Sequence, residues 1–250
     1  MNAGAPPSDF QPAPHRPSFR DRFPGTFGLI LFTCLVFLGQ WLSQQFLDVD
    51  WLLQFGAKAR APMLQGQWWR FLTPMFLHIG LPHLFVNMYS LFAIGPAVER
   101  FFGTPRFIAT YFLSGLAGTI FSLAFSPYAS AGASGAIFGL LGSLGAFLYL
   151  HRVLFGRLGQ IQLRQILFVA LLNLALGLMP GIDNWGHLGG LLSGACLSYL
   201  LGPRYQVHWD ELGSPRLSDA RPWHKSRIQY LLAAVLLGVL AVASLFSPFT

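Results

Sequence analysis

The side chains best suited to chemistry in this sequence are a serine and a histidine that each begin an apolar stretch. Ser134 lies in the run Gly-Ala-Ser-Gly, and His187 lies in Asn-Trp-Gly-His-Leu-Gly-Gly. A serine hydroxyl beside a histidine is a nucleophile with its general base, the combination used in acyl transfer. Either stretch alone also fits a helix-packing seam, because small residues let membrane helices approach closely and serine is common among them.

A second histidine and an asparagine form another polar pair in an apolar segment. His83 and Asn87 are four residues apart, so both project from one face of a helix. Such groups can donate hydrogen bonds to the oxyanion that develops during acyl transfer. The same pair can equally bond a neighbouring helix, so the spacing alone leaves both interpretations open.

The composition indicates a membrane protein with several spans. Hydrophobic residues make up 54% of the 250 residues and charged residues only 10%, against roughly 25% in soluble domains. A soluble fold could not cover that much apolar surface. Cys34 and Cys196 lie in apolar runs without metal-ligand spacing, so we expect small hydrophobic side chains there and neither a metal nor a cofactor.

We therefore predict an all-α fold, a polytopic membrane bundle of seven spanning helices. About 20 mostly apolar residues are needed to cross the hydrocarbon core. The long loop after the first span holds several tryptophan and phenylalanine residues, which suit the membrane–water interface. The apolar runs lie at about 27–46, 82–102, 105–125, 134–151, 162–179, 185–201 and 228–246.

The charge distribution predicts how these spans are oriented. Of the 16 lysine and arginine residues, 13 fall on the side of the N-terminus, and only Lys58, Arg60 and Arg70 fall on the other. The positive-inside rule then places the N-terminus in the cytoplasm and the C-terminus outside. Topology accounts for the formal net charge of +7, and no interleaved basic and aromatic motif indicates a nucleic-acid partner.

This orientation brings the polar residues of the apolar segments to one depth. The second, fourth and sixth spans run from outside to inside, so His83, Asn87, Ser134 and His187 all lie just below the outer surface. A helix N-terminus at Ser134 also favours negative charge. A nucleophile, a base and two hydrogen-bond donors at one depth are the parts that peptide hydrolysis needs.

We expect no catalytic role for two carboxylates on or beside the same spans. Asp183, four residues before His187, is expected to lie in the exposed outer loop. Glu99, at the inner end of the second span, is too deep to join the other residues and is expected to be a buried structural carboxylate.

The motifs, taken together and in this order, resemble those of the rhomboid family of intramembrane serine proteases over roughly residues 26–202. The stretch around the serine resembles the family's G-x-S-G, and the histidine stretch resembles its H-x-x-G-x-x-x-G. The residues concerned are Trp69-Arg70 (the W-R pair of the first loop), His83 and Asn87 (H-x-x-x-N), Gly132–Gly135, and His187 with Gly190 and Gly194.

The resemblance implies an intramembrane endopeptidase with a Ser134–His187 dyad and no catalytic aspartate. His83, Asn87 and the Ser134 backbone N–H would form the oxyanion hole. Phe138 stands where relatives often have a tyrosine packed on the catalytic ring, so the aromatic face is kept and the hydroxyl is lost.

The resemblance also implies the partners and organisation of the chain. Substrates would be single-span or polytopic membrane proteins cut in the lipid bilayer near its outer face, and the oligomeric state stays open. The size of the chain and the lack of a recognisable targeting segment favour a bacterial inner (plasma) membrane. The expected parts are a cytoplasmic polar tail at 1–25, a six-helix catalytic core at 26–202, a cytoplasmic loop at 203–227 and an additional seventh helix at 228–250.

Two other functions fit parts of the sequence. A catalytically inactive relative could bind membrane clients, although such proteins usually lack the serine or the histidine. A transporter or channel could use His83, Asn87 and His187 as a proton or ion path. Against transport, these polar groups stop near the outer surface, and no two halves of the chain look like repeats.

Overall fold

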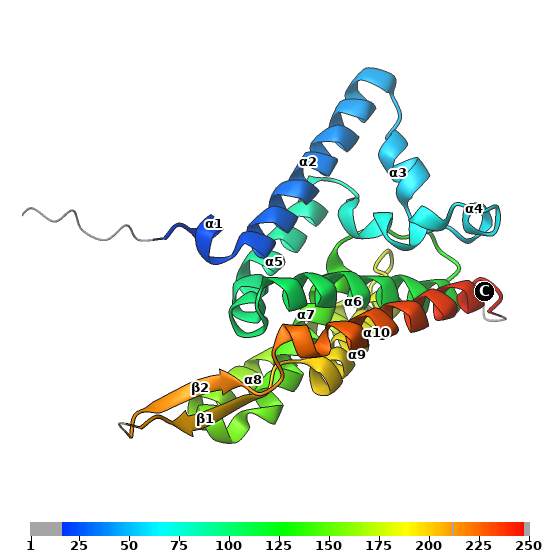
Figure 1. Cartoon of the computed structure of the whole chain (residues 1–250). Helices are drawn as coiled ribbons and strands as arrows, with labels where there is room; N and C mark the ends of the chain where they lie inside the picture. Colours follow the sequence, from blue (N-terminus) through cyan, green and yellow to red (C-terminus); the bar gives the residue numbers. More distant parts are fainter. Residues whose placement is uncertain (1–16, 212, 248–250) are drawn as a thin grey trace, which may run out of the picture.

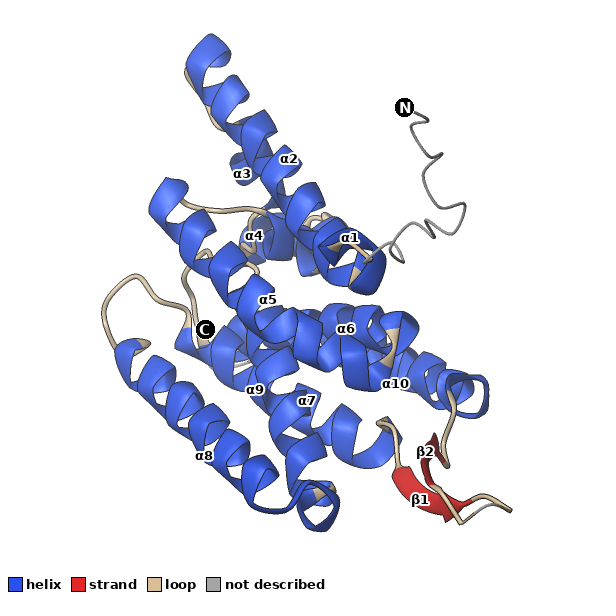
Figure 2. Cartoon of the chain, turned by 90° about the vertical axis from the view of Figure 1, so that its left-hand side faces the viewer, coloured by secondary structure: helices blue, strands red, loops and turns tan. Residues whose placement is uncertain are grey.

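The computed structural model describes residues 17–211 and 213–247 as a bundle of long helices with a short hairpin at one end (Figure 1; Figure 2). Most of the tail predicted at 1–25 and the last residues of the predicted seventh helix, 248–250, lie outside this range. The elements are α1 (Phe19–Arg22), α2 (Pro24–Leu47), α3 (Trp51–Gly56), α4 (Arg60–Leu64), the 3₁₀ turns η1 (Trp68–Phe71) and η2 (Thr73–Phe76), α5 (Leu81–Phe102), α6 (Thr104–Phe125), α7 (Ser134–Leu150), α8 (Arg152–Leu176), α9 (Asn184–Leu201), β1 (Tyr205–Trp209), β2 (Pro215–Asp219) and α10 (Trp223–Ser244).

The predicted spans all appear as helices. Five of them, α2, α5, α6, α8 and α10, are long and apolar enough to cross a membrane by length and composition. The fourth predicted span forms α7, which is apolar but has only 17 residues, and the sixth forms α9, whose 18 residues begin with the polar run Asn-Trp-Gly-His. The chain is a polytopic helical membrane bundle, as the composition predicts.

Two helices begin earlier than the apolar runs suggest. α8 starts at Arg152 rather than near residue 162, and α10 starts at Trp223 rather than near residue 228. Hydropathy marks the stretch that fits hydrocarbon, whereas a helix can continue beyond it into polar surroundings. Within α8, the backbone leaves helical geometry at Gly156, whose φ of 54° only glycine adopts without cost.

Glycines let α7 and α9 pack backbone to backbone at the centre of the bundle. A Cβ atom added at Gly190 would overlap the carbonyl oxygen of Gly135, and one added at Gly194 would overlap that of Gly139. Small residues permit this approach between membrane helices, where packing rather than burial from water drives association. The seam extends along the helices that carry Ser134 and His187, so it sets how far apart those two residues lie.

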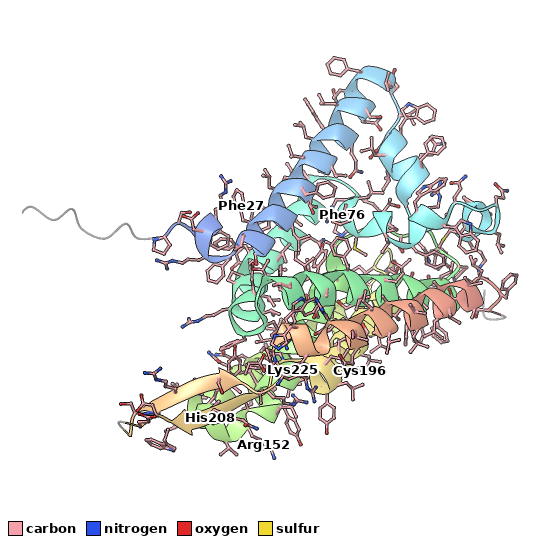
Figure 3. All side chains as sticks on the ribbon, in the orientation of Figure 1. Phe27, Phe76, Arg152, Cys196, His208 and Lys225 are labelled. Carbon is pink, nitrogen blue, oxygen red and sulfur yellow. The ribbon has the colours of Figure 1, made fainter. Side chains whose placement is uncertain are left out.

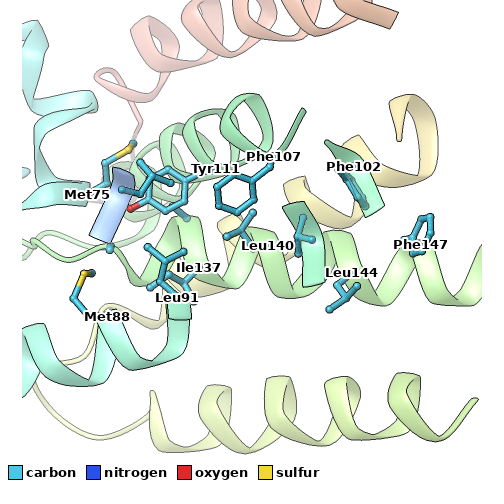
Figure 4. Packing of buried hydrophobic residues seen from close by; sticks show 14 of the residues in the cluster. Met75, Met88, Leu91, Phe102, Phe107, Tyr111, Ile137, Leu140, Leu144 and Phe147 are labelled. Carbon is cyan, nitrogen blue, oxygen red and sulfur yellow. The ribbon is translucent and has the colours of Figure 1, made fainter. Parts of the chain in front are cut away.

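Apolar side chains fill the space between α5, α6 and α7. Leu91 of α5, Tyr111 of α6 and Leu140 of α7 are fully buried and belong to one cluster (Figure 4). We call the end of the bundle where α5, α7 and α9 begin the Ser134 end. The opposite end, where α6 begins and the hairpin lies, is the Arg106 end.

Side chains of the long loop after α2 hydrogen-bond to backbone carbonyls of the same loop. Arg70 is buried and donates to the carbonyl oxygens of Ala57 at 2.6 Å and Gln54 at 2.8 Å. The Trp69 indole donates to the carbonyl of Phe55 at 2.7 Å, with half of its side chain exposed. The motif Trp-Arg therefore serves to hold the loop together at the Ser134 end.

A two-stranded antiparallel hairpin stands where the sequence predicts only a loop at 203–227. β1 pairs with β2 so that Tyr205 faces Asp219. The Tyr205 N–H donates to Nε2 of His151 at 3.0 Å, and its hydroxyl donates to the carbonyl of Phe101 at 2.9 Å, which fixes the hairpin base beneath α5 and α7. Arg152, His208 and Lys225 all lie at this end (Figure 3).

The seventh helix, α10, is tied to α6 at both ends and lies alongside it (Figure 1). At the Arg106 end, the guanidinium of Arg106 pairs with Asp219 at 2.7 Å and donates to the hydroxyl of Ser226 on α10 at 3.1 Å. At the Ser134 end, Arg60 donates to the carbonyls of Leu123, at the end of α6, and Leu245, just after α10, at 2.5 and 2.8 Å. Cationic donors at helix C-termini satisfy carbonyls that have no intrahelical partner.

Glu99 is a structural carboxylate at the Arg106 end, as expected. It is buried, and the backbone N–H groups of Gly25 and Thr26 donate to it at 2.8 Å each, as do the hydroxyls of Thr26 and Thr104. Its partners are therefore the first turn of α2 and the turn after α5 rather than the adjacent Arg100. Free N–H groups at a helix start favour a negative charge, so Glu99 joins α2 to α5.

Candidate active site

The structure brings Ser134 and His187 together at the Ser134 end. Ser134 is the first residue of α7, His187 lies in the first turn of α9, and the Ser134 Oγ atom is 2.8 Å from Nε2 of His187. This is the separation of a nucleophile hydrogen-bonded to its general base. The pair is 53 residues apart in sequence, and the glycine seam between α7 and α9 makes the approach possible.

Phe138 lies one helical turn after Ser134 and covers the imidazole. The two rings are parallel within 7°, with centroids 4.4 Å apart. Nδ1 of His187 is buried, and none of the residues that the structure describes hydrogen-bonds to it. Within that part of the chain the serine and histidine thus form a hydrogen-bonded pair, called the dyad below, whose imidazole contacts an aromatic face and has no carboxylate at Nδ1.

His83 points toward the chain that leads into Ser134. The backbone N–H of Ile79 donates to its Nδ1 at 3.3 Å, so the neutral ring carries its proton on Nε2. A Cβ atom added at Gly132 would lie 2.9 Å from that Nε2. Gly132 also has a φ of 142°, which side chains disfavour, so glycine is required here on both counts.

Asn87 is buried one turn further along α5. Its Nδ2 donates to the carbonyl of His83 at 2.9 Å within the same helix. An amide nitrogen has two N–H groups, so the second remains for another acceptor. The structure therefore places Asn87 on the same helix face as His83, without a direct hydrogen bond to Ser134.

A small cavity adjoins the dyad. It has a volume of about 40 Å³, and its lining includes Ser134, His187, Ser130, Asp183 and Thr119. A polar cavity needs roughly 10–15 Å³ to hold one water molecule, so this one has room for water beside the serine.

His78 is a site residue whose role the sequence does not indicate. It is 1% exposed, and its Nε2 accepts a long hydrogen bond, 3.5 Å, from the N–H of Ala133, the residue before the serine. Burial is the main reason that its pKa falls to about 4, and the nearby His83 lowers the pKa further. His78 therefore stays neutral at pH 7, and only its position just before His83 could have drawn attention to it.

Asp183 differs from its expected place. It is half-buried rather than exposed, it caps the start of α9, and it lines the cavity beside the dyad. In the sequence, only its position four residues before His187 drew attention to Asp183. The partner of its second carboxylate oxygen, Ser122 on α6, is 61 residues earlier and follows from no local pattern.

The fold and these residues define a polytopic helical membrane protein with a serine and a histidine hydrogen-bonded at one end of its bundle. A sequence profile of the Rhomboid domain matches residues 65–204. The chain belongs to the rhomboid family and is an integral membrane protein.

Several curated relatives are similar over much of this chain. It is 39% identical over 204 residues to the Rhomboid protease GluP of Bacillus subtilis, an alignment that covers 80% of this chain and 35% of GluP. It is 37% identical over 197 residues to the mitochondrial RHOMBOID-like protein 6 of Arabidopsis thaliana, covering 78% of this chain and 64% of that one. The Rhomboid protease AarA of Providencia stuartii is 31% identical over 177 residues, an alignment that covers 61% of this chain and 63% of AarA. The chain thus spans about a third to two thirds of the length of these relatives.

Proposed function

We propose that this protein is an intramembrane serine endopeptidase that uses Ser134 and His187 as its catalytic dyad. The observation that carries the proposal is the 2.8 Å separation of Ser134 Oγ and His187 Nε2 in a membrane bundle. Membership of a family whose relatives include named rhomboid proteases supports the same reaction class.

The first step is acylation of the serine. Ser134 Oγ attacks the scissile carbonyl carbon while His187 Nε2 takes the hydroxyl proton, and the C–O bond forms as the carbonyl becomes an oxyanion. The backbone N–H of Ser134, Nε2–H of His83 and the free N–H of Asn87 are the donors available to that oxyanion. His187 then gives its proton to the leaving amine as the C–N bond breaks.

The second step is hydrolysis of the acyl-enzyme. Water in the cavity beside Ser134 attacks the ester carbonyl while His187 Nε2 again accepts a proton, and breaking the ester bond returns that proton to Ser134 Oγ. Phe138 keeps the imidazole in one plane through both steps, since a stacked ring restricts its rotation.

The substrate would be a membrane-spanning helix cut near the outer face. The positive-inside distribution of lysine and arginine supports an orientation with the Ser134 end of the bundle outside and the N-terminus in the cytoplasm, in what we propose to be a bacterial inner membrane. A substrate helix hides its carbonyls in intrahelical hydrogen bonds, so it must unwind locally to reach the serine. Weak helix formers near the cut should therefore increase cleavage.

The test is cleavage of a single-span model substrate by the purified full-length protein in detergent, with products mapped by mass. We expect one cut near the outer end of the substrate span, faster when Gly-Pro is placed beside it. Ser134→Ala and His187→Ala should each abolish cleavage in folded protein, and the double variant should be no worse, because the dyad acts as a unit.

The competing function, binding of membrane clients without proteolysis, gives a different result. The substrate would then co-purify with the protein and stay intact. Cleavage that persists in folded Ser134→Ala would contradict the assignment of the nucleophile, and a cut at the cytoplasmic end of the substrate would contradict the orientation.

A further inference from the structure

The first turn of α9 is fixed to the bundle by a carboxylate outside the dyad. One oxygen of Asp183 accepts the N–H of Gly186 at 3.0 Å, and the carbonyl of Asp183 accepts the N–H of His187 at 3.2 Å. Asp183 is therefore the N-cap of the helix that carries the base. An N-cap side chain satisfies an N–H that the helix leaves without a partner.

The other oxygen of Asp183 links α9 to a different helix. It accepts the hydroxyl of Ser122, a buried residue near the end of α6. The Ser122 hydroxyl is also 3.4 Å from that of Ser130, which lies in the loop leading to Ser134. The Lys58 ammonium donates to the backbone carbonyl of Ser122 at 3.4 Å, and the Lys58 backbone pairs with Ser130. The start of α9, the end of α6 and the approach to the nucleophile thus share one network.

The first turn of α9 is packed so closely against its neighbours that small movements of its backbone matter. A Cβ atom added at Gly118 of α6 would lie 2.8 Å from the carbonyl oxygen of Gly186, and one at Gly135 of α7 would lie 3.3 Å from it. The first turn of α9 therefore rests against glycine surfaces of both neighbours. Without its cap and its link to Ser122, this turn keeps backbone contacts on those sides, and its side-chain hydrogen bonds within the described residues are that of Asn184 to the carbonyl of Leu174 and that of His187 to Ser134.

We propose that Asp183 is the positioning residue for the base: by capping α9 and bonding Ser122 it holds His187 Nε2 at hydrogen-bond distance from Ser134. This inference rests on the proposed protease function. Asp183 acts through geometry and is not a third member of the dyad, because its oxygens are directed to Gly186 and Ser122 rather than to Nδ1 of His187.

The experiment measures how fast Ser134 reacts, apart from how much protein is folded. The full-length protein in detergent is titrated with a serine-directed phosphonate, which gives both a rate constant of labelling and a final labelled fraction. Asp183→Ala is expected to lower the rate constant about 10- to 100-fold, with the labelled fraction unchanged, because displacements near 1 Å cost about that much. In the cleavage assay the same variant should lower kcat and leave KM nearly unchanged.

Three further variants separate geometry from charge and from general stability. Asp183→Asn should retain a rate within a few fold of the wild type, because asparagine caps helices as well as aspartate does. Ser122→Ala, which removes only the link to α6, should fall between the wild type and Asp183→Ala. Asp21→Ala is the matched control: Asp21 also accepts a backbone N–H and a serine hydroxyl, both from Ser18, but lies at α1. It should label at the wild-type rate.

Each contrary result overturns the inference. Labelling of Asp183→Ala at the wild-type rate would remove the positioning role. A smaller labelled fraction with an unchanged rate constant would reduce Asp183 to a stability element. An Asn variant as slow as the Ala variant would show that charge, not geometry, is needed. A wild type that neither labels nor cleaves overturns the proposed function and the inference together, whereas an active wild type with an indifferent Asp183→Ala overturns the inference alone.

Discussion

The imidazole of His187 lies flat against the phenyl ring of Phe138, 4.4 Å between centroids and 7° from parallel. Both residues sit one turn or less from the start of their helices, so the stack joins α9 to α7 beside the serine. A ring held in this way can direct Nε2 to Ser134 although Nδ1 has no carboxylate among the described residues. The aromatic face supplies the orientation that a hydrogen-bonded acid supplies elsewhere.

Phe138→Ala should therefore slow phosphonate labelling of Ser134 by about 2- to 10-fold, the equivalent of an aromatic pair worth roughly 0.5–1.5 kcal/mol. Phe138→Tyr should label nearly as the wild type does, since the ring face is kept. Phe101→Ala is the control, because it removes a ring that is stacked on Phe147 at the Arg106 end, away from Ser134. It should lower the melting temperature without changing the labelling rate.

His83→Ala and Asn87→Ala should each reduce kcat, by less than loss of the serine. One oxyanion donor is typically worth about 10²–10³ in rate, and sharing between donors lessens each single effect. Asn173→Ala is matched to Asn87→Ala, since its amide also donates to the carbonyl four residues earlier, but on the exposed face of α8. Equal kcat values for the wild type and both site variants would show that His83 and Asn87 only pack helices.

Gly139→Ala should destabilise the bundle, because its Cβ would overlap the side chain of Ser114 on α6. Overpacking of this kind costs roughly 1–3 kcal/mol, and more where no neighbour can move. Gly238→Ala on α10 adds the same methyl group where no atom of the described residues lies within 4 Å, and should be neutral or slightly stabilising. Thermal unfolding in detergent compares the two variants; equal melting temperatures would contradict the close packing at Gly139.

Asp219→Asn should loosen the attachment of the hairpin and α10 to Arg106. Burial alone would raise the pKa of Asp219, but hydrogen bonds from Arg106 and from the N–H groups of Arg204 and Arg221 outweigh it and hold the pKa below its ordinary 3.8. We expect a loss of about 1.5–3 kcal/mol at neutral pH, the range for a hydrogen bond to a charged group.

The pH dependence of that loss has a definite sign. Because the folded-state pKa is depressed, the stabilisation is complete above pH 3.8 and disappears as the pH falls through the lower folded-state value. Arg216→Gln, which removes the exposed pair with Asp210, is the control and should cost at most about 1 kcal/mol. Unfolding at several pH values decides this: a gap between Asp219→Asn and the wild type that persists unchanged into strong acid would be inconsistent with the ion pair.

Much of the architecture could be predicted because lipid imposes simple rules on sequence. Runs of about 20 apolar residues, the excess of arginine on alternate connections, and glycines at fixed spacing each report one physical constraint. Helices α2, α5, α6, α7 and α9 begin or end within a few residues of the predicted runs. The hairpin was missed, since its strands are only five residues long, and what fixes them is contact with Phe101, Arg106 and His151.

The sequence by itself indicated which residues could do chemistry and that they lie at one end of the bundle. Ser134, His187, His83 and Asn87 are reactive or polar types at the starts of apolar helices, and helix direction alone brings such starts to one side of the membrane. Only the tertiary structure decided which atoms meet, above all Ser134 Oγ and Nε2 of His187. The other contacts between distant residues are Phe138 with His187, Asp183 with Ser122, Arg60 with Leu245, and Arg106 with Asp219. Hydropathy fixes position along the membrane normal, whereas the lateral order and rotation of helices follow from contacts between residues far apart in the chain, which no local pattern encodes.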